Sequence, residues 1–157
     1  MTAVDLQEKH TTSDERMLHY PTNFGDVALR DDRLISFPKG LLGLAWCTVF
    51  GLSRMPNSDD SPLLLLQCVN DPTITFLCAE PGILGTPLQE EDEKKALKEV
   101  GYSPKNSQFL AILTLYNHGG ESYLTANLRA PVIIDSSQRV GVQHVLSNQD
   151  YSTQQKV

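Results

Sequence analysis

The sequence predicts a mostly β protein, a small antiparallel β-barrel-like single domain with one short helix. Three observations lead to this prediction. Apolar runs of strand length recur along the chain, residues with turn chemistry separate them, and only one segment has the composition of a helix. The length of 157 residues also fits a single domain with a sizeable core.

The two ends of the chain differ from the middle in composition. Residues 1–19 are polar and aperiodic, so we expect them to form a disordered N-terminal extension. Residues 148–157 are similarly polar, and we expect a flexible C-terminal tail there. The predicted barrel domain therefore spans residues 20–147.

Turn signals divide the middle of the chain into predicted strands. "RDDR" separates an alternating segment around Val27 from "LISF", which predicts a first hairpin. "NDP" separates "LLLLQCV" from "ITFLCA", and Asp before Pro favours a turn, so a second hairpin is expected there. About eight strands are predicted in all, at residues 26–30, 34–37, 47–53, 63–69, 74–79, 109–116, 123–134 and 140–147.

The one predicted helix lies in "PLQEEDEKKALKEVG". Pro87 suits a first helical turn, acidic residues follow it, and Gly101 can end the helix. Lys94 follows Glu90 by four residues, which is the favourable order for an exposed ion pair. The charge of this helix is therefore expected to face solvent.

The stretch "FPKGLLGL", which begins at Phe37, combines two glycines with several apolar side chains. We expect Phe37 to be an inward anchor at a strand end, and Gly40 and Gly43 to adopt backbone angles that other residues avoid. The leucines of so short a turn cannot all point inward. The stretch is either a corner of the core or a partly exposed partner surface, with Leu41 and Leu42 as candidate contacts and Leu42 at the tip.

Composition argues against several kinds of chemistry. The formal net charge is −6 and no window is rich in basic residues, which disfavours direct nucleic-acid binding. Cys47, Cys68 and Cys78 form no CxxC pair and lie in apolar segments, so we interpret them as core residues. No histidine has the spacing of a metal site, and we expect no cofactor and no catalytic residue. A cysteine-dependent enzyme and an oligonucleotide-binding barrel remain the alternatives.

No apolar segment follows a basic region at the N-terminus, and no apolar run is long enough to span a membrane. We therefore expect a cytoplasmic protein that does not associate with membranes.

Three segments taken together carry a family resemblance. "FGDVALRDDRLISFPKGLLGL", "LLQCVNDPTITFLCAEP" and "LTANLRAPVIIDSSQRVGVQHVLSNQDYS" resemble, in order and spacing, the FliW family of flagellar assembly factors. The resemblance covers residues 20–151. It implies a barrel-like protein without catalytic activity that binds the RNA-binding translational repressor CsrA and antagonises its repression of flagellin synthesis. It also implies binding to flagellin, so that secretion of flagellin frees the protein for the repressor.

Three polar residues complete the set of candidate partner contacts. Asn70 and Asp71 are expected at the tip of a hairpin turn, where a plain turn is favoured over a contact. Asn127 is either hydrogen-bonded to a neighbouring loop or presented to a ligand strand. Pro131 lacks an N–H donor and predicts a strand edge or a bulge. An exposed edge there could pair with an extended segment of flagellin or of the repressor.

Overall fold

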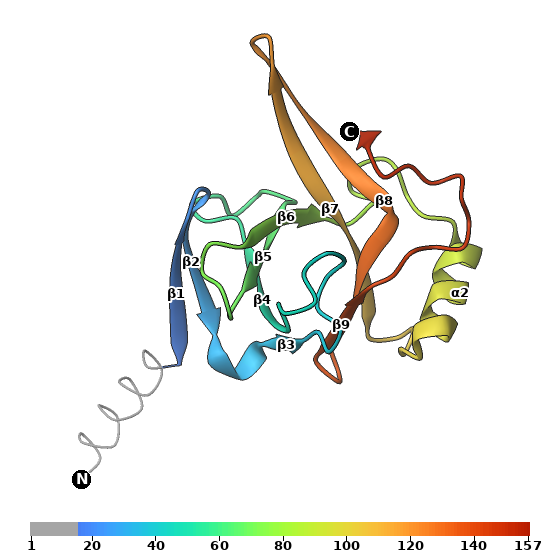
Figure 1. The fold of residues 1–157 in the computed structure, drawn as a ribbon, viewed down its shortest axis with the longest axis horizontal. Helices are drawn as coiled ribbons and strands as arrows, with labels where there is room; N and C mark the ends of the chain where they lie inside the picture. Colours follow the sequence, from blue (N-terminus) through green and yellow to red (C-terminus); the bar gives the residue numbers. More distant parts are fainter. Residues whose placement is uncertain (1–15) are drawn as a thin grey trace.

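Seven strands close into a barrel in the computed structural model, which describes residues 16–157 (Figure 1). The order around the barrel is β8, β7, β6, β5, β4, β3, β9, and a pairing between β9 and β8 closes it. All neighbours are antiparallel except β3 and β9. The predicted fold class is confirmed. The barrel strands are β3 (Ile35–Ser36), β4 (Val49–Arg54), β5 (Leu64–Cys68), β6 (Thr75–Ala79), β7 (Ser107–His118), β8 (Glu121–Asp135) and β9 (Val140–Gln143).

A separate hairpin precedes the barrel. Strand β1 (Met17–Thr22) pairs with β2 (Gly25–Arg30), and the short 3-10 helix η1 (Asp31–Arg33) then leads into β3. The predicted hairpin around "RDDR" is therefore wrong. The segment is a corner that carries the chain from one sheet into the other, and β2 pairs with the strand before it.

The hairpin packs on the barrel at a glycine of β4. A Cβ atom on Gly51 would lie 2.4 Å from Leu29 Cδ1, so the absence of a side chain lets β2 approach β4 closely. Leu29 is buried at this contact. The glycine thus fixes where the β1–β2 hairpin lies.

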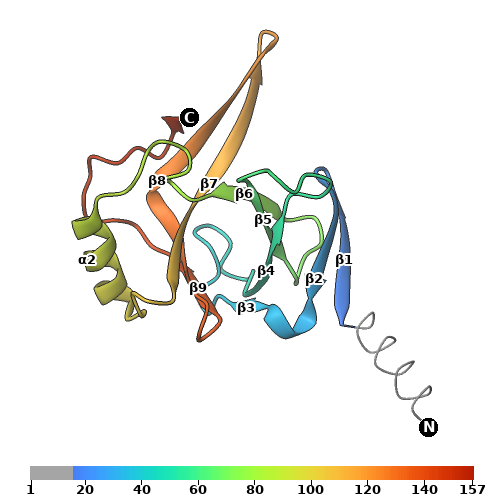
Figure 2. The same cartoon turned by 180° about the vertical axis from the view of Figure 1, so that it is seen from behind.

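The helix α2 (Glu90–Val100) confirms the helix prediction, although it begins three residues after Pro87. Gly101 ends it in the left-handed conformation at φ 78°, and Lys94 Nζ lies 3.1 Å from Glu90 Oε1. Figures 1 and 2 show α2 beside β8 and β9 on the outside of the barrel. Among residues 16–157, no helix is long and apolar enough to cross a membrane.

Strands β7 and β8 form the longest hairpin, whose tip projects away from the barrel (Figures 1 and 2). The register of this pairing shifts within the hairpin. Leu110 pairs with Val132, whereas Ile112 pairs with Asn127, so Ala111 of β7 lies opposite residues 128–131 of β8. Pro131 lies within this irregularity, so the predicted bulge is confirmed.

The C-terminal residues add a short strand to the barrel. Strand β10 (Gln155–Lys156) pairs with β8 through Ala126 and Thr125. Lys156 Nζ also lies 4.6 Å from the ring centroid of Tyr123. The predicted flexible tail is thus seated on β8 in this structure.

The N-terminal boundary also differs from the prediction. The extension was expected to reach residue 19, but β1 begins at Met17. Residues 1–15 of that extension lie outside the described residues.

The buried side chains form two clusters. One fills the inside of the ring of strands, and its members come from alternating strand positions and from the loop between β3 and β4. The other lies between the barrel and its coverings, which are α2, the β1–β2 hairpin and the C-terminal segment. All three cysteines are buried, which confirms their interpretation as core residues. The inner cluster consists of Ile35, Phe37, Leu41, Cys47, Phe50, Leu66, Cys68, Cys78, Leu110, Val132 and Ile134.

Candidate partner-binding surface

The loop between β3 and β4 is anchored from within the barrel. Phe37 is fully buried, and its ring meets that of Phe50 edge-on with centroids 4.9 Å apart. Its backbone N–H donates to the Thr48 carbonyl oxygen at 2.8 Å, which ties the two ends of the loop together. The prediction that Phe37 is an inward anchor is confirmed. In both views the loop is seen inside the ring of strands (Figures 1 and 2).

A tight turn separates the buried part of the loop from its exposed tip. Leu41 and Leu44 exchange two backbone hydrogen bonds, of 3.2 and 2.8 Å, across Leu42 and Gly43. Gly43 has φ 81° and Gly40 has φ 64°, so both adopt the left-handed conformation expected of them. This turn directs neighbouring leucines to opposite environments.

Leu41 and Leu42 therefore differ in accessibility. Leu41 is only 3% exposed and belongs to the inner core, so its side chain is not available as the contact that we predicted. Leu42 is 56% exposed, and its backbone N–H donates to Gln143 Oε1 at 2.9 Å, which holds the tip against β9. Trp46, from the same loop, is 55% exposed. We call Leu42 and Trp46 the loop surface.

A cavity of about 360 Å³ lies beside the base of this loop. Pro38 and Lys39 line it from the loop, and the rest of the lining comes from α2 and β9 and from Tyr102 and His144, which follow them. His144 Nε2 lies 3.5 Å from Glu99 Oε1 at its wall, where the imidazole side chain is 22% exposed. The cavity has apolar and polar walls and adjoins the residues that hold the loop surface in place.

The predicted contacts Asn70 and Asp71 have structural partners. Asn70 Oδ1 accepts hydrogen bonds from the backbone N–H groups of Thr48 and Val49, at 3.2 and 3.0 Å. Asp71 Oδ1 accepts from the hydroxyl and the backbone N–H of Thr73, and these bonds lower the pKa of Asp71. The structure thus brings Asn70 to the base of the loop, while Asp71 shapes the turn that was expected at "NDP".

Asn127 also bonds to its own strand. Its Oδ1 accepts a hydrogen bond from the Ala130 backbone N–H at 3.0 Å, inside the bulge of β8. Both earlier interpretations, a bond to a neighbouring loop and presentation to a ligand strand, differ from this arrangement. The edge of β8 near Asn127 is occupied as well, because the Leu128 N–H donates to the Ser152 carbonyl oxygen at 3.0 Å.

Two of the three buried cysteines, Cys47 and Cys78, lack the properties of nucleophiles. Burial raises the pKa of the Cys47 thiol to about 11, with a further contribution from the neighbouring Cys68. Burial raises the pKa of Cys78 to about 12. Because the thiolate is the reactive form, these thiols are protonated and unreactive near neutral pH. Within residues 16–157, no group of three or more His, Cys, Asp or Glu side chains could hold a metal ion.

Sequence reasoning missed Trp46. It is the only tryptophan of the chain and lies two residues after "FPKGLLGL", just before the predicted strand at residues 47–53. Tryptophan is enriched among residues that dominate protein interfaces, so its position next to the leucines was an available signal.

The fold and the loop surface define a small closed β-barrel protein that presents a structured apolar loop to solvent. The family model "FliW protein" matches residues 19–157, and the chain belongs to that family. It is 31% identical over 132 residues to "Flagellar assembly factor FliW 2" of Desulfotalea psychrophila, which covers 84% of this chain and 85% of that protein. It is 30% identical to "Flagellar assembly factor FliW" of Natranaerobius thermophilus, with 83% and 85% covered.

A solved structure supports the same assignment. The crystal structure of the flagellar assembly factor FliW matches with a TM-score of 0.68 and 25% sequence identity, covering 89% of this chain and 95% of that one. The resemblance inferred from the three sequence segments is therefore confirmed at the level of family and fold.

Proposed function

We propose that this protein is a non-enzymatic, cytoplasmic assembly factor that exchanges between two protein partners, flagellin and a CsrA-type RNA-binding repressor. Binding to the repressor would antagonise its repression of flagellin synthesis. The proposal rests on membership of the FliW family and on the exposed loop surface. It requires no cofactor, no direct contact with nucleic acid and no membrane.

The observation that carries the proposal is the exposure of Leu42 and Trp46 on a loop that the buried side chains of Phe37 and Leu41 anchor in the core. Two large apolar side chains are more than half exposed, while Phe37 and Leu41 hold the backbone beneath them in the core. An ordered loop loses little conformational freedom when it binds, so such exposed side chains suit a protein interface. The net charge of −6 also suits a basic RNA-binding partner.

The experiment that tests the proposal compares two exposed leucines. Leu42→Lys places a charge on the loop surface, whereas Leu115→Lys alters a side chain that is 54% exposed on the β7–β8 hairpin. We expect both variants to melt near the parent, because surface changes usually alter stability by about 0.5 kcal/mol or less. Leu42→Lys should weaken repressor binding by at least about tenfold, which corresponds to about 1.4 kcal/mol.

Isothermal titration calorimetry with purified repressor and, separately, flagellin measures these affinities. If Leu42→Lys binds like the parent and Leu115→Lys loses affinity, the contact lies on the β7–β8 hairpin and not on the loop surface. Failure of the parent protein to bind either partner would refute the proposed function itself.

A further inference from the structure

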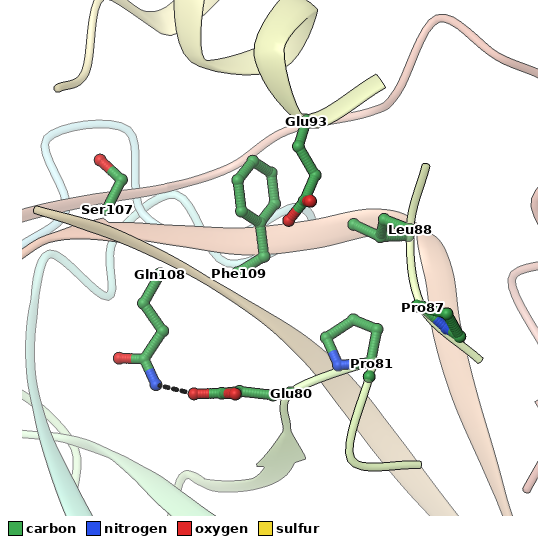
Figure 3. Close-up of a pocket in the computed structure, with 9 residues that line it drawn as sticks. Glu80, Pro81, Pro87, Leu88, Glu93, Ser107, Gln108 and Phe109 are labelled. Carbon is green, nitrogen blue, oxygen red and sulfur yellow. Dashed lines mark hydrogen bonds between the residues drawn. The ribbon is translucent and has the colours of Figure 1, made fainter. Parts of the chain in front are cut away.

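A second pocket lies where the end of β6, the segment before α2 and the start of β7 meet (Figure 3). Its volume is about 430 Å³, and it shares no residue with the loop surface or with the cavity beside Lys39. Pro81, Leu88 and Phe109 contribute apolar side chains to its lining, as Figure 3 shows. Cavities of this size commonly hold a small ligand or a single large side chain.

Two carboxylates come from different elements of this pocket. Glu93 projects from α2 toward Phe109, and Glu80 lies on the opposite side, where its Oε1 accepts a hydrogen bond from Gln108 Nε2 at 2.9 Å (Figure 3). Neither carboxylate forms an ion pair with any cation among residues 16–157. The pocket therefore holds negative charge that the described chain does not neutralise.

We propose that this pocket binds an arginine side chain of a protein partner. The aliphatic stem of arginine would pack against Pro81 and Leu88, and its guanidinium would donate to Glu80 and Glu93. A guanidinium suits this combination, because it is more weakly hydrated than an ammonium and presents five N–H donors in one plane. The net charge of −6 would favour the approach of a basic segment.

The surroundings favour a side chain within a protein over a free amino acid or a metal ion. The α-carboxylate of free arginine would be repelled by the same two glutamates. Ile83, next to Gly82 of the pocket, is 55% exposed and offers an apolar contact for the residues that flank an arginine. A metal ion is less suited, because no group of three or more His, Cys, Asp or Glu side chains within residues 16–157 could hold one.

Nuclear magnetic resonance titration of the full chain tests this site directly. The probe is N-acetyl-arginine amide, and the matched control ligand is N-acetyl-citrulline amide, which has nearly the same shape without the charge. We expect arginine amide to shift the backbone resonances of Gly82 and Gln108, and citrulline amide to leave them nearly unchanged. Equal shifts with both ligands, or none with either, would overturn the proposal. Tighter binding of free arginine than of the capped form would overturn the assignment to a protein partner.

Variants of the two glutamates locate the binding site. Glu80→Gln and Glu93→Gln keep the size of the side chain, and each should weaken arginine amide by about tenfold, because each removes one charged hydrogen bond. Glu91→Gln, an exposed position of the same helix, is the control and should bind like the parent. An equal loss in all three variants would show that only the overall charge matters. The test uses no flagellin and no repressor, so its outcome is separate from that of the proposed function.

Discussion

A methyl group added at Gly141 tests how the loop is anchored. The Cβ atom of an alanine there would lie 2.3 Å from Phe37 Cζ and 2.7 Å from both Cε atoms. Gly141 does not adopt a left-handed backbone conformation, so the substitution changes the available space and not the backbone preference. Phe37 cannot move aside easily, since it is fully buried and packs against Phe50.

The magnitudes follow from this contact. Gly141→Ala overpacks the core and should cost about 1–3 kcal/mol of unfolding free energy. Phe37→Ala should cost about 3–5 kcal/mol, because it leaves a cavity. In the double variant the methyl group enters that cavity and its own cost disappears. The double variant should therefore be more stable than the sum of the single losses predicts, by about 1–3 kcal/mol.

Urea unfolding followed by circular dichroism measures all three variants. Gly82→Ala is the control, because a Cβ atom at that exposed position meets nothing within 4 Å and its cost should stay within about 0.5 kcal/mol. If the losses of the two single variants add without any coupling, Phe37 does not lie against Gly141. The loop surface would then lack the buried support that the proposed function assumes.

Three further predictions concern the core, the surface charge and the C-terminal segment. A thiol reagent at neutral pH should leave the folded protein unlabelled and should label it in urea, since all three cysteines are buried and burial raises the pKa of Cys47 to about 11 and of Cys78 to about 12. Repressor association measured by stopped flow should slow as salt shortens the screening length below about 8–10 Å, and a salt-independent rate would mean that the net charge of −6 does not steer the partner. Tyr151→Phe should destabilise the protein at neutral pH, because the Tyr151 hydroxyl donates to Asp92 Oδ2 at 2.7 Å and lowers the pKa of Asp92. A group with a lowered folded pKa contributes stability above its unfolded pKa and loses it as the pH falls, so the difference from the parent should shrink below about pH 4 in urea unfolding.

Local signals were sufficient for the β5–β6 hairpin and for the helix. "NDP" lies between two apolar runs, and the structure pairs Leu64–Cys68 with Thr75–Ala79 around it. Gly101 ends α2 as expected because a residue in the left-handed conformation is a common helix end. Each of these features depends on residues that are neighbours in the sequence.

Strand β1 could not be predicted in the same way. Met17–Thr22 contains a proline and no regular alternation of apolar and polar residues, and it becomes a strand because β2 provides its hydrogen-bonding partner. The pairing of β2 with β1 leaves "RDDR" as the corner between two sheets. A turn signal marks a change of direction but does not identify which strands lie side by side.

The environments of the candidate contact residues also could not be predicted from the local sequence. The sequence indicated that the leucines of the loop could not all be buried, but the hydrogen bonds between Leu41 and Leu44 decide which one is exposed. Asn70 and Asn127 were candidate partner contacts, yet both side-chain oxygens accept hydrogen bonds from backbone N–H groups. A polar residue in a turn or bulge commonly serves the local backbone, and only the fold reveals that bond.

The bulge in β8 also decides where an extended partner segment could pair with the barrel. Beyond the bulge β8 pairs with β9, and before it the edge is occupied by Ser152 and β10. The Val157 N–H donates to the Leu124 carbonyl oxygen at 3.1 Å, so the last residue of the chain also lies on this edge. A partner strand could reach the predicted edge only by displacing the C-terminal residues. In contrast, the pairing of β6 with β7 ends at Leu113, and no strand among residues 16–157 pairs with the rest of β7 on that side. If a partner strand pairs with the barrel, the unpaired edge of β7, where Leu115 lies, is open to it before the occupied edge of β8 is, so a loss of binding in Leu115→Lys would report a contact there.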